Sequence, residues 1–224
     1  MHLHLFEKFV LVALDPKKGK FLIDSLSLHY GLAGAILLEL SEQNKIIIRN
    51  KRIIVSDSKY EKNAIINAGI KLLNKPKKNK KPRYWIYKIG NKSSGFKKII
   101  LKDLYNEKII KIEVKEFLWG LIKVKRYPVF NYTVVDEIKI KLKKVVLDGE
   151  EPDIDTLLLL SLMASCKLTR ILFRSKKEHR AAGKRIKDLT KNIEISEAVS
   201  QTLKEIQAAV LVATTSTFVS SSSN

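Results

Sequence analysis

Basic side chains placed directly before an aromatic ring are the residues of this sequence best suited to chemistry. The segment 121–130 carries three bases and a tyrosine in close succession: Lys123, Lys125, Arg126 and Tyr127. On a protruding hairpin, such a group suits the interface between water and lipid. Plain strand alternation, with Ile122 and Val124 facing inward and the lysines outward, explains the same pattern equally well.

Signatures of catalysis and metal binding are missing from the sequence. It has no Gly-rich phosphate loop, no His-Glu-x-x-His and no Gly-x-Ser-x-Gly. The four histidines have no spacing typical of metal ligands within one element: His2, His4, His29 and His179. Cys166 is the only cysteine, which excludes an intrachain disulfide and a zinc site built from cysteines. We therefore expect no enzyme activity, no metal and no cofactor.

The net charge of the chain favours an anionic partner. Its 43 Lys and Arg residues oppose 23 Asp and Glu residues, giving a formal charge of +20 at pH 7. Nucleic acid and the acidic face of a membrane both attract clustered Lys and Arg. A genome-wide preference for lysine codons is the alternative explanation of the excess. The 224 residues, 45% of them hydrophobic, can bury a sizeable core.

One acidic cluster interrupts the basic background, and it has two interpretations. Its members surround a proline: Asp148, Glu150, Glu151, Asp153 and Asp155. A divalent ion could bind such a group of carboxylates. The start of a helix is the favoured interpretation, because Pro152 suits the first turn and the helix dipole favours acids there.

The pattern of apolar residues predicts a mainly α chain, a single compact helical domain with small β-hairpins. Helices are expected over 3–14, 26–43, 84–118, 137–147, 154–173, 176–189 and 197–213, with a further one up to Leu73 capped by Ser58. Hairpins are expected over 45–55 and 121–130, the latter with Pro128 at an edge position. The segment 74–83 is expected to be an exposed, mobile basic linker inside a domain of residues 1–213. The Ser/Thr-rich tail 214–224 should fray.

The small-residue run Gly31-Leu-Ala-Gly-Ala-Ile-Leu-Leu-Glu-Leu40, followed by the hairpin at 45–55, forms a helix-plus-wing unit. This unit fits a winged-helix nucleic-acid binder or a helical lipid-binding module. A recognition helix should present Arg, Lys, Asn or Gln to base edges. The only charges of this helix are Glu39 and Glu42, which predicts a buried helix and disfavours nucleic acid.

Five stretches, in this order, carry a resemblance to a known family. They are Phe9-Val-Leu-Val-Ala-Leu-Asp15, the run 31–40 with Lys45-Ile, Arg126-Tyr-Pro-Val129 with Asp136, Pro152-Asp153 with Leu157-Leu-Leu-Leu-Ser-Leu162, and Lys184-Arg-Ile-Lys-Asp-Leu189. Together they make the chain resemble the Golgi phosphoprotein 3 family, and its prokaryotic branch in particular. The resemblance implies a helical domain with a hairpin for association and membrane contact. Eukaryotic members bind phosphatidylinositol 4-phosphate and cytosolic tails of Golgi glycosyltransferases.

The family's lipid pocket carries over only in part. Asp24 and Ala33 stand where the resemblance places a Trp and an Arg of that pocket, so we expect the phosphoinositide pocket not to be intact. Two later arginines of the family fall near Asn106 and Ile109, with lysines close by. The lipid-binding residues expected here are Lys108, Lys111, Lys123, Lys125, Arg126 and Tyr127.

The expected partners and location follow from the resemblance and the charge. The partners are an anionic phospholipid membrane, the cytosolic tails of membrane enzymes, and a second copy of the chain through the hairpin 121–130. The longest apolar stretch, 154–166, is too short to span a bilayer, and no signal peptide is expected. The expected location is therefore cytoplasmic and peripherally membrane-associated, on the cytosolic face of the Golgi in a eukaryote.

Overall fold

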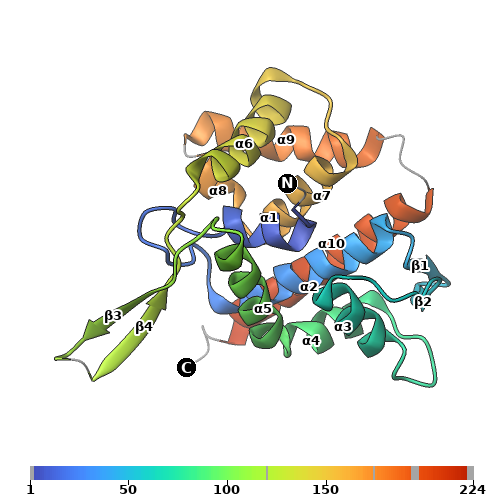
Figure 1. Ribbon diagram of the computed structural model, residues 1–224. Helices are drawn as coiled ribbons and strands as arrows, with labels where there is room; N and C mark the ends of the chain where they lie inside the picture. Colours follow the sequence, from blue (N-terminus) through green and yellow to red (C-terminus); the bar gives the residue numbers. More distant parts are fainter. Residues whose placement is uncertain (1–2, 120, 174, 193–196, 221–224) are drawn as a thin grey trace.

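The computed structural model describes residues 3–220 apart from 120, 174 and 193–196 (Figure 1). Its α-helices are α1 Leu5–Val12, α2 Ser25–Glu42, α3 Ala64–Leu73, α4 Pro82–Gly90, α5 Ser93–Asn106, α6 Tyr132–Lys143, α7 Ile154–Ser165, α8 Thr169–Leu172, α9 Lys176–Asn192 and α10 Glu197–Ser220, with a π-helical turn η1 at Lys144–Asp148. Two antiparallel hairpins join β1 Ile46–Arg49 to β2 Arg52–Val55, and β3 Glu113–Phe117 to β4 Ile122–Arg126. The prediction of a mainly α fold with small hairpins is confirmed.

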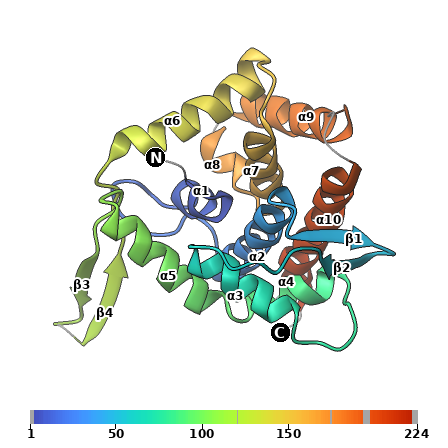
Figure 2. The ribbon, with the colours of Figure 1, turned by 45° about the vertical axis from the view of Figure 1, so that its right-hand side comes forward.

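Helix α2 lies in the middle of the helical body, against α1, α4, α7 and α10 (Figure 2). Its small residues make this packing close. A Cβ atom at Gly31 would lie 2.3 Å from Cζ of Phe9, and one at Gly34 would lie 2.8 Å from Cγ2 of Val210. The buried surface of α2 therefore belongs to the core, as predicted, and this helix presents no basic face that could enter a nucleic-acid groove.

A buried carboxylate of α2 holds the start of α1. Glu39 accepts hydrogen bonds from the backbone N–H of Leu5 at 2.6 Å and from Gln43 at 2.7 Å, and it contacts Nδ1 of His4 at 2.8 Å. Burial alone would raise the pKa of Glu39, but these hydrogen bonds outweigh it and lower the pKa. The hydrogen bond to Glu39 raises the pKa of His4 despite partial burial. The charged pair thus fastens two sequence-distant helices.

The hairpin at 45–55 forms as predicted. Arg49 pairs with Arg52, and the two turn residues between them, Asn50 and Lys51, have φ of 52° and 57°. Positive φ at both positions is typical of the tight turns that match strand twist. Ile48 and Ile53 are buried, which fixes the inward face of the hairpin.

The linker and its flanking helices differ from the prediction. Helix α3 is capped by Asn63, whose Oδ1 accepts from the N–H groups of Ile65 and Ile66, and not by Ser58. The segment 74–83 is largely exposed, but its end belongs to α4, where Pro82 is buried. The carbonyl of Lys80 accepts a hydrogen bond from the N–H of a β2 residue at 2.9 Å, so this segment is attached to the first hairpin.

Four predicted helical regions also have different limits. Region 137–147 begins earlier, at Tyr132, and its last part is the π-helical turn η1. Region 84–118 divides into α4, α5 and the strand β3, and region 154–173 divides into α7 and α8 at Lys167, which has a φ of 59°. Helix α10 continues to Ser220 instead of ending near residue 213. The Thr214 side chain is buried, and its hydroxyl donates to the carbonyl of Leu211 at 3.0 Å, which supports this extra turn. Residues 221–224 of the expected tail lie outside the described residues.

The acidic cluster begins a helix, as favoured by the sequence. Asp153 is the N-cap of α7: its Oδ1 accepts from the N–H of Thr156 at 2.9 Å, and Lys141 donates to its other oxygen. Burial opposes ionisation of Asp153, but these bonds lower its pKa to about 2. Within the described part of the chain, no group of three His, Cys, Asp or Glu residues is arranged to hold a metal ion.

Candidate functional site

The β3–β4 hairpin extends away from the helical body as a two-stranded arm (Figures 1 and 2). It spans 113–126, whereas the sequence placed the hairpin at 121–130 and its first strand in a helix. Cα partners run from Glu113 opposite Arg126 to Phe117 opposite Ile122. The prediction for this first strand was wrong because α5 ends after Asn106 without a Gly or Pro stop signal, in a turn where Lys108 has a φ of 58°.

The tip of this arm is apolar and exposed. Trp119 is 100% exposed, Leu121 83% and Leu118 59%. The N–H of Leu121 donates to the carbonyl of Leu118 at 3.2 Å, closing a turn in which Leu118 and Trp119 both have positive φ. A left-handed conformation costs a side-chain-bearing residue about 1–2 kcal/mol. Strain and exposed apolar surface coincide at this tip, which is typical of a contact site.

Basic side chains follow the tip along β4, from Lys123 near the tip to Arg126 opposite Glu113 at the other end of the strand. Side chains alternate along a strand, so Lys123 and Lys125 lie on one face and Arg126 on the other. Lys123 and Lys125 are exposed, and Lys123 forms a 3.0 Å ion pair with Glu116 across the strands. The alternation predicted for β4 is present, but Ile122 is 48% exposed, so neither face is sealed into the core near the tip.

Tyr127 serves the base of the arm and not its tip. The ring is partly buried 6.3 Å from the ring of Phe21, and burial raises the pKa of the Tyr127 hydroxyl. Its N–H donates to the carbonyl of Gly19 at 2.8 Å. Pro128, expected at an edge of the hairpin, is buried just beyond β4, where its carbonyl accepts from the N–H of Lys111 at 2.8 Å. These contacts attach the arm to the body.

Lys108 and Lys111 lie where the β3–β4 arm joins the body, in a shallow depression of about 360 Å³. Its other lining residues are Tyr105, Asn106, Ile110 and Phe130. The Nζ atom of Lys111 lies 4.7 Å from the centroid of the exposed Phe130 ring, within cation–π range. The structure therefore places the six predicted residues in two groups, one along the arm and one at its base.

The sequence prediction missed the apolar tip residues Leu118, Trp119 and Leu121. The signal that could have found them is the run Leu-Trp-Gly-Leu-Ile at 118–122, in which a glycine sits between apolar residues that cannot all be buried in a turn. The prediction placed most of this run at the end of a helix, where a stripe of apolar residues would be buried.

The two positions that the resemblance assigns to a phosphoinositide pocket have structural roles in this chain. Asp24 is the N-cap of α2 and accepts from the N–H groups of Leu26 at 3.0 Å and Ser27 at 2.9 Å. Burial opposes ionisation of Asp24, but hydrogen bonds from Ser27 and Leu26 lower its pKa. Ala33 is fully buried in the core. Neither position offers a cation or an aromatic ring to a head group.

Comparison with known proteins identifies the family of the chain. The model of the Golgi phosphoprotein 3 (GPP34) family matches residues 5–206, from the first residue of α1 into α10. No curated protein matches the chain. Among the described residues, no helix is long and apolar enough to cross a membrane. Because the family match covers most of the fold, as the ordered motifs predicted, the chain belongs to the Golgi phosphoprotein 3 (GPP34) family.

Proposed function

We propose that this family member is a non-enzymatic peripheral membrane protein that binds anionic lipid surfaces through the β3–β4 hairpin. The observation that carries the proposal is the fully exposed Trp119, held between exposed Leu118 and Leu121 at the end of an arm. Apolar surface of this kind gains free energy by leaving water for lipid. Tryptophan in particular is enriched at the membrane–water interface, at the level of the lipid head groups.

The basic residues behind the tip support the choice of an anionic surface. Lys123, Lys125 and Arg126 would approach the head groups as the tip enters the membrane, with Lys108 and Lys111 at the base. Each base near an anionic membrane contributes about 1 kcal/mol. Loss of the three hairpin bases should therefore weaken binding by about 3 kcal/mol, or roughly 100-fold.

Flotation of the protein with lipid vesicles tests this proposal. Neutral phosphatidylcholine vesicles are compared with vesicles that also contain phosphatidylserine, at low and high salt, with duplex DNA as a competitor. Three variants keep the fold and change one feature each: W119S/L121S at the tip, K123S/K125S/R126S on β4, and K75S/K77S/K78S in the exposed segment between α3 and α4. The third is the matched control, because it removes three exposed bases far along the chain from the arm.

The expected result is binding to anionic vesicles that falls steeply as salt rises, because screening acts within about 8–10 Å at these ionic strengths. The tip and β4 variants should bind weakly, and the control should bind nearly as well as the unchanged protein. Equal flotation with neutral and anionic vesicles at low salt would contradict the proposal. If the β4 variant and the control lose the same amount of vesicle binding, the protein binds through its overall positive charge and the hairpin is not a specific binding site.

We expect little preference for phosphatidylinositol 4-phosphate over other lipids of matched charge. Asp24 and Ala33 cannot supply the ring stacking and charge-assisted phosphate bonds that an aromatic residue and an arginine would give. Vesicles of equal charge, with and without this lipid, measure the preference. A preference of about a hundredfold, near 3 kcal/mol, would show that other residues rebuild the pocket.

We also propose that the protein is an adaptor for the cytosolic tails of membrane enzymes. The basis of this second proposal is its membership of the family.

The same apolar tip could instead join two copies of the chain. Sedimentation of the unchanged protein and of W119S/L121S without lipid distinguishes dimerisation through the tip from membrane contact, because a tip-mediated dimer would dissociate in the variant. The proposed location is cytoplasmic, at the membrane surface, and on the cytosolic face of the Golgi in a eukaryote.

A further inference from the structure

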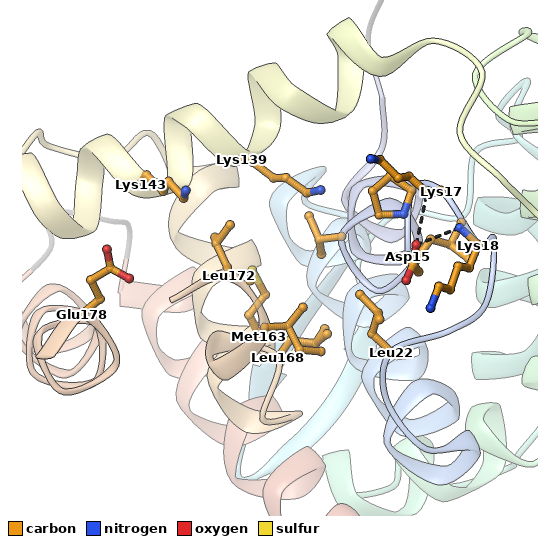
Figure 3. Close-up of a pocket in the computed structure, with 14 residues that line it drawn as sticks. Asp15, Lys17, Lys18, Leu22, Lys139, Lys143, Met163, Leu168, Leu172 and Glu178 are labelled. Atoms are coloured by element: carbon orange, nitrogen blue, oxygen red, sulfur yellow. Dashed lines mark hydrogen bonds between the residues drawn. The ribbon is translucent and has the colours of Figure 1, made fainter. Parts of the chain in front are cut away.

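A cavity of about 650 Å³ lies between α6, the loop that follows α1, and the α7–α8 segment, with the start of α9 at one end (Figure 3). Its floor is apolar and is formed by Val12, Leu14, Leu22, Met163, Leu168, Ile171 and Leu172. Leu14, Met163 and Leu168 are almost fully buried, so the floor reaches the core. The volume falls in the range of sites for small molecules, about 300–1,000 Å³.

Lysines surround the mouth of this cavity. Lys139 and Lys143 come from α6, one turn apart, and Lys17 and Lys18 come from the loop after α1 (Figure 3). In the part of the chain that the structure describes, none of these four forms an ion pair, although their neighbours Lys141 and Lys144 do. Four lysines therefore line the cavity without an ion pair to a carboxylate among the described residues.

Two carboxylates also line the cavity and offset only part of the charge of its four lysines. Asp15 accepts hydrogen bonds from the backbone N–H groups of Lys18 at 2.8 Å and Lys17 at 3.0 Å, which hold it in its own turn. These bonds, together with the nearby charges of Lys18 and Lys20, lower the pKa of Asp15. Glu178 lies at the far end, in the first turn of α9, where the helix dipole favours an acid. The lysines at the mouth remain in excess.

We propose that this cavity binds a single-chain anionic amphiphile, with the acyl chain on the apolar floor and a carboxylate or phosphate head among the four lysines. An inorganic anion would leave the floor unused, and a neutral or cationic amphiphile would leave the lysines without partners. The site is separate from the hairpin tip and from Asp24 and Ala33, so the proposal goes beyond membrane contact by the arm. A fatty acid and an anionic lysophospholipid share this chemistry.

Isothermal titration calorimetry with soluble C10 probes tests the proposal on the full chain. Decanoate and decyl phosphate are compared with decyl maltoside, decyltrimethylammonium and inorganic phosphate, with every amphiphile kept below its micelle concentration. We expect the two anionic amphiphiles to bind with one-to-one stoichiometry and the other three to bind at least about tenfold more weakly, since each lacks the head-group pairing or the chain. The tighter of the two anionic probes identifies the preferred head group.

Variants distinguish the cavity from general charge. K139S/K143S should weaken decyl phosphate at least about tenfold. The matched control K98S/K102S removes two exposed lysines with the same helical spacing on α5 and should bind normally. Ile171→Trp, which fills the half-buried floor, should abolish binding of both anionic probes, and W119S/L121S should bind both normally. Thermal unfolding verifies that each variant is folded.

Each of four results would overturn the proposal. Three of them are an absence of one-to-one binding by both anionic probes, equal affinity for decyl phosphate and decyltrimethylammonium, and equal weakening by K98S/K102S and K139S/K143S. Retention of full affinity by a folded Ile171→Trp variant would likewise place the amphiphile elsewhere.

Discussion

Adding one methyl group at Gly31 should destabilise the protein, whereas the same change at Gly183 should stabilise it. Both glycines lie inside helices, α2 and α9, so Gly→Ala gains about 1 kcal/mol of helix propensity at either position. A Cβ atom at Gly183 would have no heavy atom within 4 Å. At Gly31 it would lie 2.3 Å from Cζ of Phe9 and 2.6 Å from Sγ of Cys166, both of which are buried.

The size of the difference follows from these contacts. Overpacking a core costs typically 1–3 kcal/mol, and two simultaneous clashes place Gly31→Ala near the upper end, at about 3 kcal/mol. After the gain in helix propensity, the net loss is about 2 kcal/mol. For a chain of this size, that corresponds to a melting temperature lower by about 4–8 °C. Gly183→Ala should raise the melting temperature by about 2–4 °C.

Circular dichroism during thermal and urea unfolding measures both variants. A rescue experiment tests the cause: Phe9→Leu shortens the side chain that clashes, so the double variant with Gly31→Ala should be more stable than the sum of the single losses predicts. If Gly31→Ala is as stable as the unchanged protein, or if both variants shift in the same direction, the close approach of α2 to its neighbours does not limit stability, and the packing argument fails.

Two other features of the helical body give measurable expectations. The Glu39–His4 pair should stabilise the fold most between about pH 4.5 and 6.5, the ordinary pKa values of the two groups. The pKa of Glu39 is lowered in the folded protein, so its contribution is lost as pH falls through this lowered pKa. The pKa of His4 is raised, so its contribution is lost as pH rises through this raised pKa. Glu39→Gln should therefore flatten the dependence of unfolding free energy on pH, and an unchanged profile would contradict the linkage. Asn63→Ala should lower the free energy of unfolding in urea by about 1 kcal/mol, because the N-cap of α3 is lost. Ser58→Ala should change it by less than about 0.5 kcal/mol. Equal effects of the two substitutions would show that Asn63 does not stabilise α3 as its cap.

The central helices could be predicted from the sequence because their signals are long and local. The run 31–40 combines small and large apolar residues and has few charges, a pattern that only a buried helix accommodates. The structure places it in the middle of the body. Its neighbour β1–β2 was equally clear, since two β-branched runs flank a two-residue turn.

The β3–β4 arm could not be placed correctly from local signals. Glu113–Phe117 does not alternate as a half-buried strand should: its two apolar residues, Val114 and Phe117, are three positions apart, a spacing that fits one turn of helix at the end of α5. Its partner strand decides in favour of a strand, because the ladder with β4 pairs the backbone groups that the two strands turn toward each other. The exposure of Trp119 follows from that pairing and from the positive φ values in the turn, neither of which the sequence displays.

The loop after α1 connects the two surfaces for which we propose binding. The carbonyl of Gly19 accepts from the N–H of Tyr127, and a Cβ atom at Gly19 would lie 2.3 Å from the backbone nitrogen of Pro128, so only glycine allows this contact. The two residues before Gly19, Lys17 and Lys18, line the cavity. The described residues of the tip, Leu118, Trp119 and Leu121, are exposed and have no contact of this kind with the core. Its side chains can therefore change with little effect on folding, whereas a side chain at Gly19 would disturb the base of the arm and the rim of the cavity together.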